Sequence, residues 1–337
     1  MKNNIFKSLI LLVFTAFLCI SCDQEQFNLN TKIKVIKYNN GLKSDVEMLA
    51  FRDFEEFFQT MKDLDERTLE HILSFNEKHQ GLTEDEYNYM IDSLCFNEEQ
   101  ILDDFQSSCN FKQSMRTKFN ILESIWLDND SLDQSLDPIK QYPFSSIEMT
   151  LLNEYGEVKI GDGILKMLDS GYIYITDGSL ITLSSFNNGD NSVLNQSNVN
   201  SGFNSLFDCL LIAYENLPYH YFDGNKMARM HLHFHTYVVD VVSNTNLTIY
   251  RKNNSNGKWR KWAMYMTVGN TTFFFNNQCE YDSGIYEPNR SANTKSLSNH
   301  CYKLNLNNCQ WLRAKNNASV CGNFYWSTYH VRDVLSW

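Results

Sequence analysis

Three histidines, His231, His233 and His235, alternate with apolar residues in the C-terminal half of the chain. In a β-strand, successive side chains point to opposite faces, so the three imidazoles would share one face with Cα atoms about 6.5 Å apart. Imidazole nitrogens bind zinc and copper, and a neighbouring strand can supply a further ligand. The alternative is an amphipathic strand whose polar side consists of these histidines, with Leu232 and Phe234 directed into the core.

A second group alternates cations with aromatic rings on both sides of an Asn-rich loop, residues 253–257. As a hairpin, this segment would show Lys258, Arg260 and Trp262 on one face and Trp259, Lys261 and Tyr265 on the other. Cations between aromatic rings can hold polyanions or stack on sugars, but lysines on an edge strand also discourage pairing between sheets. The candidate ligand contacts are Arg251, Lys258, Trp259, Arg260 and Trp262.

Cysteines form the third group. Of the nine, Cys19 and Cys22 belong to the N-terminal segment, which leaves seven. In an exported chain pairing is the default, and an odd number leaves at least one thiol over. The candidates for disulfides are Cys279, Cys301, Cys309 and Cys321, which allow three pairings. Zinc is the competing interpretation for these four cysteines, but they contain no C-x-x-C motif and their spacings are wide.

Motifs for a defined reaction are absent from the sequence. There is no G-x-S-x-G, no Walker loop, no G-x-G-x-x-G and no H-E-x-x-H. A cysteine nucleophile at Cys321, with His300 or His330 as base, matches no thiol-protease signature and competes with disulfide formation. The sequence therefore assigns no catalytic residue, and a non-catalytic role is favoured.

The elements that would position these groups fall into two kinds. Residues 46–141 predict helices, with capping signals at Asp53 and Thr83, a further cap at Asn97, and apolar stripes such as Phe57, Phe58 and Met61. From residue 205 to 337, aromatic and β-branched residues with frequent turn signals predict an antiparallel sheet or sandwich. The fold class expected is α+β: a helical N-terminal region followed by an antiparallel β-rich C-terminal domain with disulfides.

Smaller segments complete the layout. Residues 22–45 predict a tether followed by a short strand, and residues 142–186 a small β-hairpin module that turns at Asp162-Gly163. Residues 187–204, rich in Asn, Gly and Ser, predict a linker or long exposed loop.

Charge is unevenly placed along the chain. The net charge is −11, but residues 201–337 hold 13 Lys+Arg against 8 Asp+Glu, hence +5, so residues 1–200 carry −16. A dedicated nucleic-acid binder would show a strongly basic domain, so nucleic acid is not an expected partner. With 43% hydrophobic residues in 337, the chain can bury substantial cores.

The N-terminus predicts export. Lys2 and Lys7 precede an apolar run, residues 9–18, which is too short to span a bilayer and typical of a signal peptide. Ser21-Cys22 follows and resembles the lipobox of bacterial lipoproteins, with Cys19 where such boxes usually carry leucine. The resemblance implies cleavage after residue 21 and attachment of acyl chains, palmitate among them, to Cys22. The membrane would then be a partner through this lipid, because more than one acyl chain gives stable anchoring.

Two further segments resemble exported proteins of the Bacteroidota. Residues 23–25, Asp-Gln-Glu, resemble the acidic signals that direct lipoproteins of this group to the outer surface. Residues 151–164 resemble an "LLNxxGExxIGDxI" element of uncharacterised Bacteroidota lipoproteins, and residues 229–262 resemble their basic aromatic hairpin more loosely. The resemblance implies a cell-envelope location, at the outer membrane or cell surface, and brings no activity with it.

The function expected from the sequence is therefore a lipid-anchored surface or periplasmic module that binds a glycan, polyanion or protein partner without catalysis and without a cofactor. The alternative is a metal-binding protein or metalloenzyme that holds zinc or copper through His231, His233 and His235. A third possibility is a purely structural surface component.

Overall fold

In this computed structural model the described residues are 33–129, 132–169, 171–203, 212–236, 240–273, 285–286, 290–292, 294–302, 319–326 and 328–336. The predicted signal peptide, Cys22 and most of the tether lie outside these residues. Within the described part, no helix is both long enough and apolar enough to cross a membrane.

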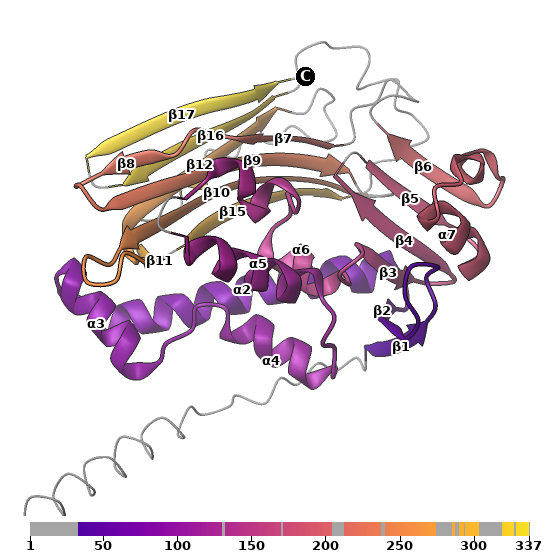
Figure 1. The fold of residues 1–337 in the computed structure, drawn as a ribbon, viewed down its shortest axis with the longest axis horizontal. Helices are drawn as coiled ribbons and strands as arrows, with labels where there is room; N and C mark the ends of the chain where they lie inside the picture. Colours follow the sequence, from indigo (N-terminus) through magenta and orange to yellow (C-terminus); the bar gives the residue numbers. More distant parts are fainter. Residues whose placement is uncertain are drawn as a thin grey trace, which may run out of the picture.

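A mixed six-stranded sheet lies at one end of the molecule (Figure 1). Its strands pair antiparallel, except that β2 and β3 run parallel. The order across the sheet is β1 (Lys34–Tyr38), β2 (Val46–Phe51), β3 (Glu157–Ile160), β4 (Gly163–Leu168), β5 (Gly171–Ile175) and β6 (Val199–Phe203). Along the chain, the helix α7 (Leu180–Asn187) and the 3-10 helix η3 (Asn191–Asn195) connect β5 to β6.

The helical layer is formed by residues between β2 and β3. Its elements are α2 (Phe54–Lys78), α3 (Glu84–Leu94), α4 (Gln100–Ser108), α5 (Met115–Leu127), η1 (Gln134–Leu136), η2 (Pro138–Lys140) and α6 (Ser146–Leu151). Asp53 caps α2, and Thr83 with Glu86 forms a capping box on α3, as predicted. Asn97 is not a helix cap: α4 begins after Glu99, and the Asn97 side chain binds the Glu99 amide and Asp103 instead.

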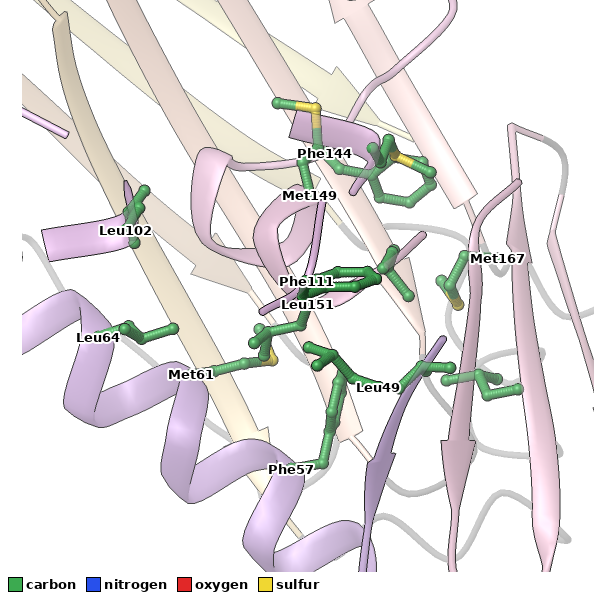
Figure 2. Packing of buried hydrophobic residues seen from close by; sticks show 14 of the residues in the cluster. Leu49, Phe57, Met61, Leu64, Leu102, Phe111, Phe144, Met149, Leu151 and Met167 are labelled. Atoms are coloured by element: carbon green, nitrogen blue, oxygen red, sulfur yellow. The ribbon is translucent and has the colours of Figure 1, made fainter. Parts of the chain in front are cut away.

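The core of this layer joins the helices to the mixed sheet. Phe57, Met61 and Leu64 of α2 meet Leu49 of β2, and Phe111, Met149 and Leu151 pack against them (Figure 2). The stripe formed by Phe57, Phe58 and Met61, which was predicted as core, is therefore buried.

The C-terminal residues form two further sheets. The first contains β7 (Ile212–Asn216), β8 (His220–Phe222), β9 (Lys226–Thr236), β10 (Asp240–Lys252), β11 (Trp259–Lys261) and β15 (Thr294–Tyr302). The second contains β12 (Met264–Phe273), β13 (Ile285–Tyr286), β14 (Arg290–Ala292), β16 (Ser319–Trp326) and β17 (Tyr329–Ser336). Every pairing within these two sheets is antiparallel.

Apolar side chains hold the two sheets face to face. Met230 and Leu232 of β9 and Leu247 of β10 meet Met266 of β12 and Trp326 of β16 in one buried cluster. The opposite face of β9 and β10 is covered by the helical layer, as the stacking of the layers in Figure 1 shows. The predicted α+β class is confirmed: helices fill the N-terminal half, and antiparallel sheets fill the C-terminal region.

Two segments have a secondary structure other than the one expected. Residues 46–51, inside the predicted helical region, form β2, because the buried run Val-Glu-Met-Leu-Ala-Phe pairs with β1 and β3. The Asn-rich stretch 187–204, expected to be a linker, contains η3 and β6, which pairs with β5. In both places pairing with distant strands, which local sequence does not reveal, decides the conformation.

The element at residues 151–164 has a structural explanation. The Asn153 side chain donates to the Glu47 carbonyl and to Glu157 Oε2, both at 3.1 Å, and accepts from the amides of Tyr155 and Glu157. Gly156 has φ +78, and a Cβ there would lie 2.3 Å from the Met167 carbonyl oxygen. The predicted β3–β4 hairpin is confirmed, but its left-handed turn residue is Gly161 rather than Gly163.

Candidate functional site

The helix-facing side of β9 is polar, whereas its other side is apolar. Arg229 is buried on the polar side, between the helical layer and the sheet. Its guanidinium binds Glu123 of α5 at 2.9 Å and Asp137, the cap of η2, at 3.1 Å. Aromatic rings flank it, with the Tyr250 and Trp126 centroids 5.1 and 5.7 Å from its central carbon. Two carboxylates from the helical layer therefore neutralise a buried cation of the sheet.

Glu123 is the centre of this network. One carboxylate oxygen accepts from Arg229 and from the Tyr250 hydroxyl at 2.8 Å, and the other from Lys261 at 2.8 Å. Burial alone would raise the pKa of Glu123, but the charges of Lys261 and Arg229 and the hydrogen bonds outweigh it and lower this pKa to about 2. Glu123 is therefore ionised at neutral pH, although it is almost completely buried.

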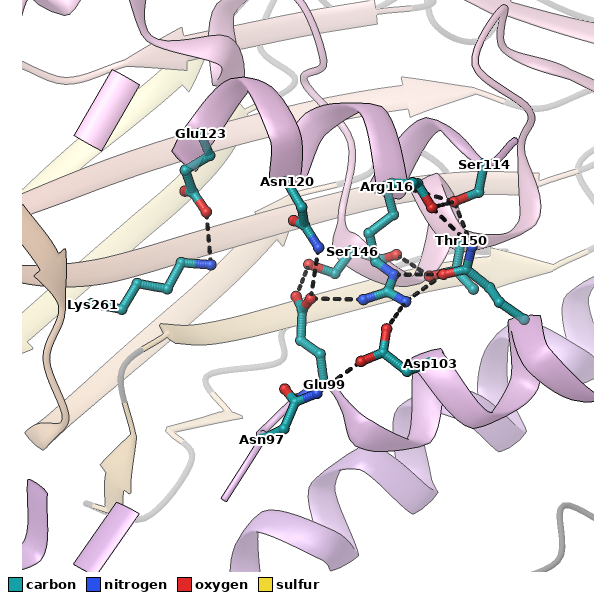
Figure 3. Close-up of polar contacts among 12 residues, drawn as sticks. Asn97, Glu99, Asp103, Ser114, Arg116, Asn120, Glu123, Ser146, Thr150 and Lys261 are labelled. Carbon is teal, nitrogen blue, oxygen red and sulfur yellow. Dashed lines mark hydrogen bonds and ion pairs between the residues drawn. The ribbon is translucent and has the colours of Figure 1, made fainter. Parts of the chain in front are cut away.

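A second network, around Arg116 and Glu99, lies beside the Glu123–Lys261 pair (Figure 3). Arg116 of α5 binds Glu99 at 2.9 Å and Asp103 at 2.5 Å, and Ser146 donates to Glu99 at 2.8 Å. Burial opposes ionisation of Glu99, yet the charges of Lys261 and Arg116 lower its pKa. The pKa of Lys261 is raised, because Glu123 and Glu99 outweigh its burial. Lys261 therefore ties β11 to α5, and Arg116 and Glu99 tie α4, α5 and α6 to one another.

The histidine row lies next to these networks. His231 and His233 are both buried on the helix-facing side, with ring centroids 5.3 Å apart, while Leu232 belongs to the core between the sheets. The predicted common face is confirmed for these two residues. His231 Nδ1 lies 2.7 Å from Asn216 Oδ1, and His233 Nε2 lies 3.6 Å from the Glu148 carboxylate. Burial, followed by His233 and Arg229, lowers the pKa of His231, so that imidazole is neutral.

The space around these imidazoles is small. A cavity of about 30 Å³ is lined by His231, His233, Arg229 and Glu99, among others, and it has room for no more than one or two water molecules. Among the described residues, no group of three His, Cys, Asp or Glu side chains is placed to hold a metal. The side chain of His235 lies outside the described part, so the three-histidine site stays a prediction.

The predicted basic hairpin is present as β10 and β11, with Arg251 opposite Arg260 and Lys252 opposite Trp259. Its cations meet acidic side chains of the helical layer. Arg251 binds Asp85 at 2.6 Å and Arg260 binds Asp92 at 2.7 Å, both carboxylates belonging to α3. Two of the predicted ligand contacts, Arg251 and Arg260, therefore form ion pairs with α3.

Trp262 has a structural role next to these ion pairs. It is 4% exposed, lies in the core between the sheets, and its indole nitrogen donates to Glu84 at the start of α3. The guanidinium groups of Arg251 and Arg260 lie 4.2 and 4.8 Å from its ring centroid. These contacts make Trp262 part of the packed interior of the protein.

Trp259 lies in a different environment. It is half-buried, and its ring centroid is 6.2 Å from that of Tyr221, which is 57% exposed. Lys252 Nζ lies 6.0 Å from the Trp259 ring, and the neighbouring Lys258 binds Asp128 at 2.7 Å. The sequence did not predict that Tyr221 lies beside the hairpin, because the two are far apart along the chain. The pairing of β8 with β9, next to β10, brings it close.

The cysteine predictions fall mainly outside the described residues. Cys279 and Cys309 lie outside them, and Cys301 and Cys321 are placed only by the backbone of β15 and β16. The proposed disulfides stay predictions. Cys109, at the end of α4, is a half-buried free thiol whose pKa burial raises.

No protein-family model matches the chain, and no curated protein matches it. A matching solved structure is the crystal structure of a DUF4848 family protein from Bacteroides thetaiotaomicron. It is 11% identical, and the match covers 90% of this chain and 100% of that one with a TM-score of 0.18. At this low identity and TM-score, the similarity does not indicate an activity for the protein.

Proposed function

We propose that this protein is an exported, lipid-anchored cell-envelope protein that binds a glycan at the end of the β10–β11 hairpin. The surface in question, here called the hairpin-end surface, consists of Tyr221, Lys252, Lys258 and Trp259. The observation that carries the proposal is the exposed Tyr221 ring beside Trp259. Two rings that meet at an interplanar angle of 63° offer an apolar face and a wall to a sugar ring.

The charge pairing of the hairpin favours a glycan over a polyanion. A polyanion is bound by cations that release counterions on contact. Here Arg251, Arg260 and Lys261 each have a carboxylate partner in the helical layer, as does Lys258. A polyanion would have to displace these carboxylates, whereas stacking on Tyr221 and Trp259 leaves them in place.

Glycan binding is tested by array screening of the protein without its first 22 residues, followed by calorimetric titration of the glycans retained. We expect Trp259→Ala and Tyr221→Ala to weaken binding at least tenfold. Tyr265→Ala is the matched control, because Tyr265 is 58% exposed and lies on β12 of the other sheet. Binding that is unchanged in the folded Trp259→Ala, Tyr221→Ala double variant would refute the hairpin-end surface, and capture of a protein partner alone would refute the glycan.

The anchor is supported by the sequence of residues 1–25, with its short apolar run and Ser21-Cys22. Mass spectrometry of the protein from its host should find a mature chain that begins at an acylated Cys22. Cys22→Ala should move the protein from the detergent phase to the aqueous phase in phase partitioning. An intact leader, or an unmodified Cys22 in aqueous-phase protein, would contradict the anchor while leaving glycan binding open.

Metal binding remains the second candidate, favoured by one observation. His231 Nδ1 faces an amide oxygen, the arrangement in which a ligating imidazole directs its other nitrogen to a metal. Elemental analysis for zinc and copper tests it. Stoichiometric metal that is lost in His231→Ala would establish metal binding. Metal-free protein whose melting temperature does not change on addition of zinc or copper would refute it.

A further inference from the structure

A ligand-sized groove runs along the outer side of the helical layer, on residues that neither the hairpin-end surface nor the buried networks use. Its volume is about 510 Å³, within the range of small-ligand sites. One wall is the C-terminal half of α2, from Arg67 to Lys78, and the other is the start of α4, with Gln100 and Asp104. The apolar part of the lining is Phe75 of α2, Phe96 and Ile101 of α4. We call this feature the α2–α4 groove.

The lining of α2 repeats at helical spacing. Residues 67, 70, 71, 74, 75 and 78 are three or one apart, so they form one continuous face of the helix. From Arg67 to Lys78 this face extends about 16 Å at 1.5 Å per residue. On this face Glu70, Ser74 and Lys78 are exposed, and Phe75 is buried. A long polar strip with an aromatic base is thus open to solvent.

The charges of the groove balance. Arg67 and Lys78 are cationic, and Glu70 and Asp104 are anionic, so neither a polyanion nor a polycation is favoured. Gln100 donates to Asp104 at 2.8 Å and holds that carboxylate in place. A neutral ligand with many hydroxyl groups matches this mixture of donors and acceptors, because each hydroxyl both donates and accepts.

The aromatic base is fixed by stacking. The Phe75 and Phe96 centroids are 3.8 Å apart with an interplanar angle of 12°, and His71 stacks on Phe96 at 4.8 Å. His71 Nε2 donates to the Asn97 carbonyl at 3.0 Å, which fixes the orientation of this ring in the lining of the groove. The base is therefore preorganised and needs no rearrangement to receive a ligand.

Peptides fit this groove less well. Extended peptides are recognised by pairing with a free sheet edge, and helical peptides by an apolar groove. Both walls here are helices, whose interior backbone groups are already bonded within the helix, and the lining is largely polar. All polar contacts to a ligand would come from side chains, as suits the hydroxyl groups of a sugar.

From these observations we infer that the α2–α4 groove is a second binding site, specific for a neutral oligosaccharide, with Glu70, Gln100 and Asp104 hydrogen-bonded to its hydroxyl groups. The inference does not depend on the hairpin-end surface. Its lining residues belong to α2, α4 and the turn before α4, and none of them belongs to β8, β10 or β11.

The test uses the chain without its first 22 residues and neutral tri- to pentasaccharides, as an array followed by calorimetric titration of each glycan retained. Glu70→Gln with Asp104→Asn should weaken binding at least tenfold, because both changes remove acceptors that hold hydroxyl groups. Glu77→Gln is the matched control, an exposed carboxylate of α2 that does not line the groove. Thermal unfolding of each variant shows that the fold is kept.

Three results would overturn the inference: retention of no neutral oligosaccharide, equal affinity of the double variant and Glu77→Gln, or binding only of peptides. Failure of the groove is distinguishable from failure of the hairpin-end surface. Trp259→Ala should leave groove binding within twofold of the unmodified protein, and the Glu70, Asp104 double variant should leave hairpin binding unchanged.

Discussion

The buried interface around Glu123 and the hairpin-end surface around Trp259 contain similar residues, namely cations, tyrosines and tryptophans. At the interface Arg229, Tyr250 and Lys261 are all bonded to Glu123; Arg229, Tyr250 and Glu123 are buried, and Lys261 is partly buried. At the hairpin-end surface, Tyr221 is 57% exposed. The same chemistry thus holds the layers together in one region and faces solvent in the other. Residue type alone therefore does not identify a binding site.

Ion pairs between the two halves of the chain account for part of its charge asymmetry. The acidic half supplies Glu123, Asp137, Asp85 and Asp92, and the basic half supplies their partners on β9, β10 and β11. Much of the basic surface expected to meet a partner therefore meets the protein's own helices.

The largest effect is expected from Glu123→Ala. Removing this carboxylate leaves the buried Arg229 and the partly buried Lys261 each with one partner fewer, and breaking a buried pair such as Arg229–Glu123 costs about 3–5 kcal/mol. Urea denaturation measures the loss. Glu66→Ala, on the exposed face of α2, should change stability by about 0.5 kcal/mol or less. A loss below about 1 kcal/mol for Glu123→Ala would remove the distinction between the two regions.

Trp262 and Trp259 are expected to contribute differently to stability. Trp262→Ala should cost about 3–5 kcal/mol, because the side chain is buried between the sheets and a cavity remains. Trp259→Ala should cost much less, because the ring is only partly buried. The same denaturation experiment compares them. Equal losses would show that Trp259 is a structural residue.

Acid should weaken the interface but not the apolar core. The pKa of Glu123 in the folded protein is about 2, below the ordinary value of 4.5, so the unfolded chain binds more protons between these values. Its contribution of about 3 kcal/mol is complete above about pH 5 and is lost as the pH falls towards 2. Glu123→Gln should flatten this part of the stability profile. A profile that stays parallel to that of the unmodified protein would argue against the assigned pKa.

The smallest effect is expected from the exposed pairs of the hairpin. Arg260 and Asp92 are each about half exposed, so Arg260→Ala should cost about 1 kcal/mol or less at low salt. At 1 M NaCl the loss should vanish, because the screening length falls to about 3 Å. The loss from Glu123→Ala should persist at high salt. Denaturation of both variants at low salt and at 1 M NaCl measures this difference. Equal salt dependence of the two losses would contradict the account.

Local signals in the sequence predicted part of the fold. The capping box at Thr83 and Glu86 predicted the start of α3, because its two hydrogen bonds involve residues only three apart. The alternation around the Asn-rich loop predicted the β10–β11 hairpin for the same reason. Leu232 between His231 and His233 predicted two unlike faces of β9.

Long-range contacts accounted for the rest. The parallel pairing of β2 with β3 joins Ala50 to Lys159, and nothing near residue 50 indicates it. The environment of Trp262 depends on α3, and that of Trp259 on Tyr221 of β8. The sequence showed which residues could bind a ligand, but only the packed layers separate those in the interior from those at the surface.

A double-mutant cycle of Glu123→Gln and Arg229→Met tests the central claim, that matched buried charges hold the helical layer to the sheet. Unfolding free energies of the four proteins give the coupling between the two side chains. The account predicts a coupling of at least about 1 kcal/mol, since the groups are buried and 2.9 Å apart. Losses that add to within about 0.3 kcal/mol would contradict it.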